Sequence, residues 1–273
     1  MLIDLHTHTT ASDGALSPTA LVELARREGV GVLGLTDHDT VGGVAEALEA
    51  GARLGVEVIP GVEISSHYQR IEVHLLGYFV DHRHQALLER LAAWREDRVR
   101  RLHEMLDRLG RLGIRLDAGA VLTKAHGAVG RPHVAMALVE AGHVRSVEEA
   151  FDRYLADGKR AYVSRQRVPV EDGIALVRAA GGLPVLAHPG LYNNDGMIAE
   201  LAGKGLAGIE ALHTDHTDAA AARYRRLAAR HGLLCTGGSD FHGLPGAALH
   251  GLARPSLPQA DLDALRARHR ASP

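Results

Sequence analysis

The stretch Met1-Leu-Ile-Asp-Leu-His-Thr-His8 opens the chain as a short apolar run that ends in two histidines one residue apart. Apolar runs of this length are typical of buried strands. Further runs occur at Val30–Leu35, Val56–Val62, Ile71–Phe79, Leu183–Ala187, Leu206–Leu212 and Leu233–Gly238. Most are followed by a polar cluster and then by a helical pattern, which predicts a parallel sheet with helical connections.

Seven predicted strands in a chain of 273 residues favour a closed barrel over an open sheet. The third and fourth strands are separated only by the polar stretch Ser65–Arg70, which is too short for a helical crossover. The predicted fold class is therefore α/β: a distorted seven-stranded (β/α) barrel with a helical insert.

Residues 81–169 form the predicted insert. They contain a long helical pattern at Gln85–Leu109 and shorter ones at Pro132–Ala141 and Val147–Asp157. The last begins with the capping box Ser146-Val-Glu-Glu149. We expect a barrel domain made of residues 1–80 and 170–273, with the insert positioned as a cap over the mouth of the barrel.

The amino-acid composition argues against several classes of function. A net charge of −2 argues against a general basic surface for extended duplex nucleic acid. Cys235 is the only cysteine, so neither an intrachain disulfide nor a thiolate metal site can form. The N-terminus does not resemble a signal peptide, and no apolar run approaches the roughly 20 residues that span a bilayer. We expect a cytoplasmic protein without a membrane partner, and the sequence does not indicate whether it needs a protein partner.

Histidines and carboxylates gather at the predicted strand ends, where (β/α) barrels build their active sites. They are His6, His8, His38, Glu63, His74, His188, Glu210, His213, Asp240 and His242. Imidazole and carboxylate donors without thiolate suit Zn²⁺, Mn²⁺ or Fe²⁺. Because one ion takes about four to six ligands, this many donors imply two or three ions. Glu63 is the expected bridging ligand, with Asp13 and Asp240 as terminal or bridging ligands.

Several of these residues have a second interpretation. Asp13 lies in Ala-Ser-Asp-Gly, where it could be a turn residue bonded to its own backbone. Asp37 could orient a neighbouring imidazole, and Glu210 could do the same or form a salt bridge. His213 is either an acid beside the metal ligands or a substrate contact. The pair His82-Arg-His84 has the same spacing as His6 and His8 but opens the insert, so position carries more weight than spacing.

Taken together, these motifs resemble the PHP (polymerase and histidinol phosphatase) family. The resemblance rests on Asp4-Leu-His-Thr-His8, Ser12-Asp-Gly14, Leu35-Thr-Asp-His-Asp39, Pro60-Gly-Val-Glu63, Val73-His-Leu75, Ala187-His-Pro189 and Gly238-Ser-Asp-Phe-His242. It covers nearly the whole chain outside the insert, in the family's order. It implies a distorted barrel with a trinuclear metal site that hydrolyses phosphoesters. The implied metal ligands are His6, His8, Asp13, His38, Glu63, His74, His188, Asp240 and His242.

Within that family, the position of the insert resembles the 3′,5′-nucleotide bisphosphate phosphatases, whose relatives trim RNA from its 5′ end. The stretch Gly130-Arg-Pro-His133 also resembles that group. The expected substrates are therefore small phosphorylated nucleotides or short single-stranded RNA. Arg131, His133 and Lys124 are the candidate substrate-binding residues, because a helix start and an arginine can hold a second phosphate. An ordinary helix start with a solvated arginine is the alternative.

Phosphoester hydrolysis needs a nucleophile and neutralisation of the phosphoryl charge. Without a candidate cysteine nucleophile, we expect attack by a metal-bound hydroxide. The candidate catalytic residues beside the metals are His213 and Asp37, with a protonated His213 or a metal-bound water protonating the leaving group.

Three other functions remain open. A histidinol-phosphate or sugar-phosphate phosphatase would differ in its substrate. A metal-dependent amidohydrolase would need a bridging lysine or glutamate, and no lysine lies at a predicted strand end. A non-catalytic polymerase accessory would tolerate loss of His6 or Asp240 without loss of activity.

Overall fold

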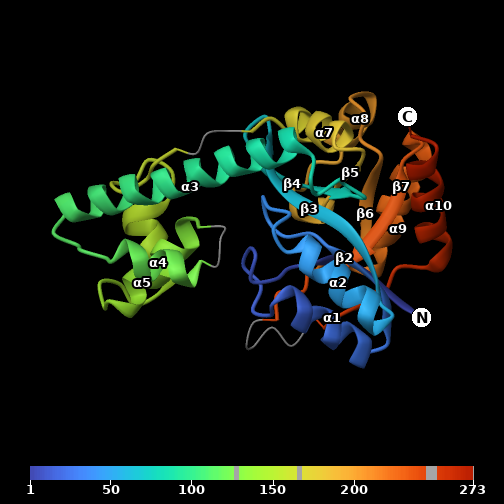
Figure 1. Ribbon diagram of the computed structural model, residues 1–273. Coiled ribbons are helices and arrows are strands. Elements are labelled where there is room, and N and C mark those ends of the chain that lie inside the picture. Colours follow the sequence, from blue (N-terminus) through green and yellow to red (C-terminus); the bar gives the residue numbers. More distant parts are fainter. Residues whose placement is uncertain (126–128, 165–167, 244–250, 273) are drawn as a thin grey trace. The chain divides into compact units, whose positions relative to one another are not determined.

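The computed structural model describes residues 1–125, 129–164, 168–243 and 251–272. The chain groups into two compact units (Figure 1). The first, here called the barrel unit, comprises residues 1–90 and 167–273, and the second, the insert unit, comprises residues 91–166. The predicted boundaries at 81 and 169 differ from this grouping mainly because the first turns of helix α3 group with the barrel unit. The domain assignment itself stays a prediction.

Seven strands of the described residues form one sheet in the order β1 to β7. They are β1 (Leu2–Thr7), β2 (Val30–Leu35), β3 (Glu57–Tyr68), β4 (Ile71–Tyr78), β5 (Leu183–Leu186), β6 (Gly208–His213) and β7 (Leu234–Gly238). Strands β1 to β3 pair in parallel, as do β5 to β7, whereas β4 is antiparallel to both neighbours. A bridge from Thr7 to Phe241 joins the two edges, so the sheet is nearly closed into the predicted distorted α/β barrel.

The connection between β3 and β4 is shorter than predicted. Strand β3 runs through Ser65 and Ser66, which are buried and pair with His74 and Val73 of β4. Only Gln69 and Arg70 remain as the turn, with Gln69 in the left-handed region at φ 55°. The polar serines belong to the strand because their side chains lie inside the unit. This hairpin places β4 directly alongside β3, so Glu63 within β3 and His74 within β4 lie on neighbouring strands.

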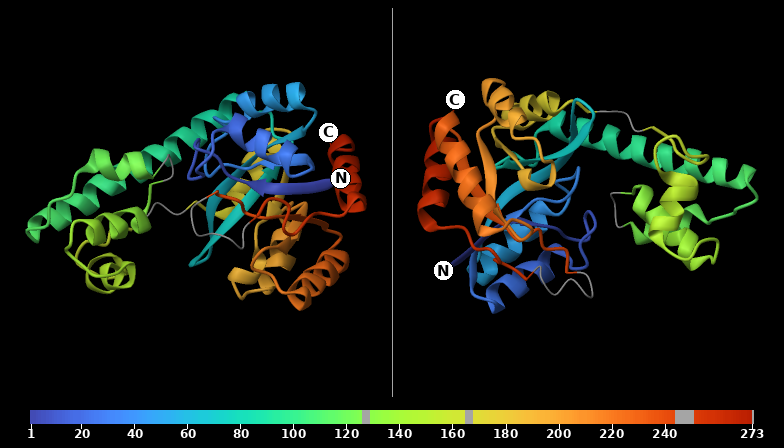
Figure 2. Two further views of the ribbon diagram at one scale, coloured as in Figure 1. Left: turned by 90° about the horizontal axis from the view of Figure 1, so that it is seen from below. Right: turned by 180° about the vertical axis from the view of Figure 1, so that it is seen from behind.

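Helices cover the outside of the sheet (Figure 2). In the barrel unit they are α1 (Pro18–Arg27), α2 (Val44–Leu54), α7 (Val170–Ala179), α8 (Gly196–Gly203), α9 (Asp218–His231) and α10 (Gln259–Arg270). Helix α7 packs on β3 to β5, α9 packs on β6 and β7, and α10 packs on β7. Helix α1 begins after Ser17, whose side chain accepts a hydrogen bond from the backbone N–H of Ala20. Buried Ile3, Leu5, Val32 and Leu76 belong to the core of this unit.

The insert unit is helical, as its sequence patterns predict. Its elements are α3 (Gln85–Arg111), α4 (Ala118–Lys124), α5 (Arg131–Glu140), α6 (Val147–Ala150) and the π-helical turn η1 (Phe151–Leu155). The predicted helix at Val147–Asp157 is therefore divided into α6 and a wider turn. Leu102, Met105, Val134 and Leu138 lie in a separate hydrophobic core.

None of the helices in the described ranges is long and apolar enough to cross a bilayer. The longest, α3, has 27 residues and carries charged side chains along its length. The expected cytoplasmic location stays a prediction.

Candidate metal centre

The strands of the barrel unit and the loops that follow them bring the predicted ligands together. His6 lies in β1 and His8 directly after it, His38 follows β2, and Glu63 and His74 lie in β3 and β4. His188 follows β5, and the pair Asp240 and His242 follows β7. His6 and His8 are fully buried, and Glu63 is 1% exposed. Polar groups this deeply buried need partners of their own.

Glu63 is the centre of the arrangement, because its carboxylate faces five imidazoles. One oxygen, Oε2, lies 3.4 Å from His6 Nε2, 3.3 Å from His8 Nε2 and 3.0 Å from His38 Nδ1. The other oxygen, Oε1, lies 2.9 Å from His74 Nδ1 and 3.2 Å from His188 Nε2. The two oxygens thus face different groups of donors, as a bridging carboxylate must.

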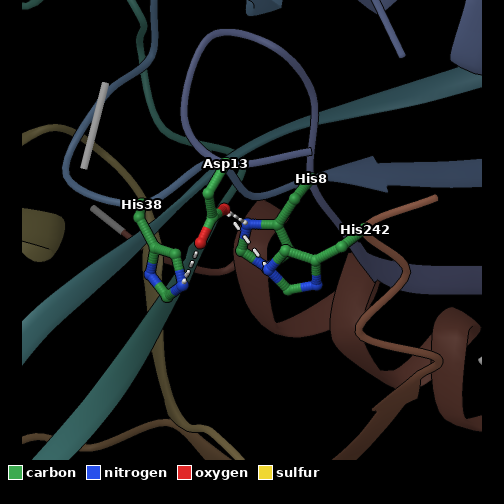
Figure 3. A group of neighbouring side chains, drawn as sticks. All are labelled: His8, Asp13, His38 and His242. Carbon is green, nitrogen blue, oxygen red and sulfur yellow. Dashed lines mark ion pairs between the residues drawn. The ribbon is translucent and has the colours of Figure 1, made fainter. Parts of the chain in front are cut away.

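Asp240 and Asp13 extend the cluster on either side of His8. Asp240 Oδ1 lies 3.0 Å from His8 Nε2 and 3.3 Å from His6 Nε2. Asp13 lies between His38 and the stacked rings of His8 and His242 (Figure 3). Its distances are 3.7 Å to His38 Nε2 and 3.3 Å to His242 Nε2. Asp13 therefore faces three imidazoles, which a simple turn residue would not do.

Hydrogen bonds fix which nitrogen of two histidines faces the cluster. His6 Nδ1 lies 3.0 Å from Glu210 Oε1, and His242 Nδ1 lies 2.8 Å from the carbonyl oxygen of Asp240. Both partners are acceptors, so these Nδ1 atoms carry the proton. When these rings are neutral, Nε2 is therefore the nitrogen that can bind a cation, the arrangement usual for histidines that bind metal ions.

Several buried polar atoms at this site have no hydrogen-bond partner within the described chain. They are His6 Nε2, His8 Nδ1, His8 Nε2, His38 Nδ1, Glu63 Oε2, His213 Nε2 and Asp240 Oδ1. Unsatisfied buried groups are rare in proteins and call for an explanation. The same atoms belong to groups of three or four donors whose ligand atoms all lie within 4.8 Å of one another. The donor types and their convergence fit divalent metal ions.

The electrostatics of the cluster follow from its alternation of imidazoles and carboxylates. Burial alone would lower the pKa of His38, but Glu63 and Asp13 raise that pKa to about 10. Burial likewise acts to raise the pKa of Glu63, yet His38, His74 and His6 hold it well below its usual value. The carboxylates are therefore ionised at neutral pH, the state in which they can bind a cation.

Three non-glycine residues at the site adopt left-handed backbone conformations. Asp39, His188 and Asp240 have φ values of 50°, 25° and 54°. Such conformations cost free energy of about 1–3 kcal/mol each and persist where the surroundings impose them. All three follow strand ends, so the barrel bends sharply where it positions its polar side chains.

The buried carboxylates outside the ligand set hold the loops in place. Asp37 accepts hydrogen bonds from the backbone and hydroxyl of Thr9 and from the hydroxyl of Ser12, so it anchors the loop that carries Asp13. Glu210 contacts His6 Nδ1 and accepts from the backbone N–H of His188, which matches the orienting interpretation.

Sequence reasoning missed the role of Asp4. Its carboxylate accepts hydrogen bonds from the backbone N–H groups of His6, Ser239 and Ala253 and from the Ser239 hydroxyl. The available signal was an acidic residue inside an otherwise apolar strand.

His213 ends β6 and lies beside the cluster. Its Nδ1 accepts a hydrogen bond of 3.1 Å from the backbone N–H of Asp215, so in the neutral ring the proton is on Nε2. Nε2 is buried and lies 3.6 Å from Asp240 Oδ2. The ring therefore presents an N–H group beside the carboxylate.

The three candidate substrate residues lie in the insert unit. Arg131 Nη1 is 3.0 Å from Asp157 Oδ1, and the guanidinium lies over the rings of Phe151 and Tyr162. The backbone N–H of Gly130 donates to His133 Nδ1, which caps helix α5. Lys124 ends helix α4, and its side chain lies outside the described part of the chain. Arg131 thus has structural partners of its own, in contrast to the solvated arginine of the alternative interpretation.

Comparison with known proteins connects this geometry to a family. The PHP domain family matches residues 4–156. The 3′,5′-nucleoside bisphosphate phosphatase of Chromobacterium violaceum is 37% identical over 88% of this chain and 87% of its own length. The 5′-3′ exoribonuclease Rnm of Escherichia coli is 38% identical over 89% of this chain and 85% of its own length.

Two solved structures are similar over almost the whole chain. A protein of Bifidobacterium adolescentis, described as a candidate metal-dependent phosphoesterase, has a TM-score of 0.83 at 32% identity, covering 97% of this chain and 96% of its own. A Chromobacterium violaceum protein described as an amidohydrolase with bound sulfate has a TM-score of 0.83 at 35% identity, covering 98% and 97%. Barrel and insert are thus both found in relatives of known structure.

Proposed function

Since this chain belongs to the PHP domain family, we propose that it is a metal-dependent phosphoesterase that hydrolyses phosphate esters of nucleotides. The observation that carries the proposal is the buried carboxylate of Glu63, whose two oxygens together face five imidazoles. A buried carboxylate in this setting is suited to hold cations.

The proposed ligands are the set predicted from the sequence: His6, His8, Asp13, His38, Glu63, His74, His188, Asp240 and His242. Their number supports two or three divalent ions, with Glu63 as a bridging ligand. Nitrogen and oxygen donors suit Mn²⁺, Zn²⁺ or Fe²⁺. When bound, such ions supply an activated water and neutralise charge on the phosphoryl oxygens.

The chain's own residues then orient the substrate and provide a proton. We assign the donor role to His213, because its buried Nε2–H lies beside the cluster, 3.6 Å from Asp240 Oδ2. It would donate to the leaving oxygen or to a phosphoryl oxygen. For Asp37, the hydrogen bonds that it accepts from the loop of Asp13 support a positioning role beside the catalytic role predicted from the sequence.

The proposed substrates are 3′,5′-bisphosphonucleotides, the 5′ ends of short RNA, or both. The names of the Chromobacterium violaceum and Escherichia coli relatives support this choice. We retain Arg131 and His133, with Lys124, as candidates for the second phosphate. For Arg131, a phosphate would have to compete with Asp157 for the guanidinium.

Two alternative functions have weaker support. A histidinol-phosphate or sugar-phosphate phosphatase would use the same metal ligands and differ only in substrate contacts. Amidohydrolase activity is suggested by the description of one structural relative. However, the chain's three lysines, Lys124, Lys159 and Lys204, all lie outside the strands, so a lysine-derived bridge is missing from the barrel.

A parallel substrate screen tests the proposal. Purified protein with added Mn²⁺ would be assayed on adenosine 3′,5′-bisphosphate, a 5′-phosphorylated oligoribonucleotide, histidinol phosphate and an amide substrate, each with an EDTA control. We expect EDTA-sensitive phosphate release from the bisphosphate or nucleotide release from the RNA. Turnover of histidinol phosphate or the amide alone would contradict the proposal.

A further inference from the structure

One turn of the barrel unit, residues His188 to Tyr192, is tied to the rest of the site at three points. The backbone N–H of His188 donates to Glu210 Oε2 at 2.8 Å. The backbone N–H of Gly190 donates to His216 Nε2 at 3.1 Å. The hydroxyl of Tyr192 lies 3.0 Å from His188 Nδ1 and accepts from the backbone N–H of His74 at 2.8 Å. These contacts hold His188 in its left-handed conformation, at φ 25° and ψ 57°.

The contact to Tyr192 determines which nitrogen of His188 faces the cluster. Nε2 lies 3.2 Å from Glu63 Oε1. If Nε2 binds a cation, the proton of the neutral ring is on Nδ1, which must then donate to an acceptor. The Tyr192 oxygen is that acceptor, and a phenol oxygen has two lone pairs, enough for both His188 and the His74 backbone.

Tyr192 connects two proposed ligands from different strands. His74 lies in β4, and His188 follows β5. Both imidazoles contact the same oxygen, Oε1, of Glu63. A single hydroxyl thus contacts the His188 ring and the His74 backbone, and the imidazoles of these two residues share one oxygen of the central carboxylate.

We propose that Tyr192 is a positioning residue of the metal centre, whose hydroxyl orients His188 and the His74 backbone so that both imidazoles bind the cation on the Oε1 side of Glu63. This inference rests on the proposed metal site. It adds Tyr192, a residue outside the predicted ligand set, to that site. It also divides the site in two, because loss of Tyr192 should first weaken cation binding next to Oε1 of Glu63.

The test is Tyr192→Phe, which keeps the aromatic ring and removes only the oxygen. Tyr224→Phe is the matched control, because the Tyr224 ring also packs on a histidine of this region, His216, at 5.1 Å. Binding of Mn²⁺ is measured by titration calorimetry on chelator-treated protein. Co²⁺-substituted protein is compared by its visible absorption spectrum, which reports the ligands of the ion.

We expect Tyr192→Phe to weaken the binding of one ion about ten- to hundredfold, the usual effect of losing a partner of a metal-binding histidine. Its Co²⁺ spectrum should change, while Tyr224→Phe should match the parent protein. Circular dichroism would verify that each variant is folded. Equal affinities and spectra for Tyr192→Phe and the parent would overturn the inference, as would equal losses in both variants. A parent protein that binds no Mn²⁺ or Co²⁺ would refute the proposed metal site as well.

Discussion

At the residue scale, the site depends on a small number of buried charges whose partners lie on other strands. Asp4, Asp37 and Glu210 are almost fully buried, and each accepts hydrogen bonds from loops that carry proposed ligands. Because removing one partner of a buried charge is costly, conservative changes at single positions can distinguish ligands from the residues that position them.

Glu63→Gln tests the central carboxylate. The substitution preserves shape but removes the charge and one acceptor oxygen, so it should abolish the bridging role. We expect kcat/KM to fall by about a hundredfold or more, because a ligand matters at least as much as its supporting partners. The measurement is steady-state phosphate release with saturating Mn²⁺. Glu23→Gln, at an exposed position of α1, is the control, and equal activity in the two variants would contradict the assignment.

Arg131→Ala tests whether Arg131 binds the second phosphate of a bisphosphonucleotide. If the guanidinium binds this phosphate, the substitution removes a charge-assisted hydrogen bond that contributes about 1.5–3 kcal/mol. The value of kcat/KM for the bisphosphate should then fall roughly ten- to hundredfold. The effect on a nucleoside monophosphate should be smaller. Arg153→Ala is a close control, since Arg153 also pairs with a carboxylate and lies over a ring in the insert unit. A purely structural Arg131 would instead affect both substrates equally.

At the element scale, several strand ends could be predicted because the apolar runs of β1, β2, β5 and β7 are closely followed by polar donors, whereas Glu63 and His74 lie within β3 and β4. The β3–β4 hairpin was only partly predictable, since Ser65 and Ser66 read as a polar connection until their burial is known. The π-helical turn after α6 has no local pattern that distinguishes it from a helix. Tyr192 is similar: its role depends on a fold that brings residue 192 beside residue 74.

Close approach of β1 and β7 leads to a prediction about Gly238. A Cβ atom at this position would lie 2.4 Å from the backbone nitrogen and the Cβ of His6. Gly238→Ala should therefore destabilise the fold by about 1–3 kcal/mol through overpacking and displace His6. Denaturant unfolding measures the free energy.

Gly110→Ala in α3 provides the opposite expectation, because open space surrounds that position. There the free energy of unfolding should rise by up to about 1 kcal/mol. An equal free energy of unfolding for Gly238→Ala and the parent protein would contradict the close packing of β1 against β7.

At the scale of the whole molecule, the sequence predicted the class of fold and the set of converging donors, because both follow from local patterns repeated along the chain. It could not predict the contacts that link distant residues. The hydrogen bonds of Asp4 to Ser239 and Ala253 join opposite ends of the chain. The pairing of Arg131 with Asp157 likewise depends on packing within the insert unit.

Metal binding should release protons. An imidazole binds a cation only after losing its proton. Burial would lower the pKa of His38, but Glu63 and Asp13 raise it to about 10. At neutral pH a cation must therefore displace this proton, so affinity should rise with pH and weaken as the solution becomes acidic. Calorimetry of Mn²⁺ binding in buffers of different ionisation enthalpy measures the protons released, and a heat independent of the buffer would contradict this prediction.

The most direct measurement of the central claim is an anomalous-difference map from crystals of the protein grown with Mn²⁺. The account predicts two or three peaks within bonding distance of the donors that converge on Glu63, among them His6, His8 and His188. A map without peaks at these side chains, from crystals shown to contain Mn²⁺, would contradict the account.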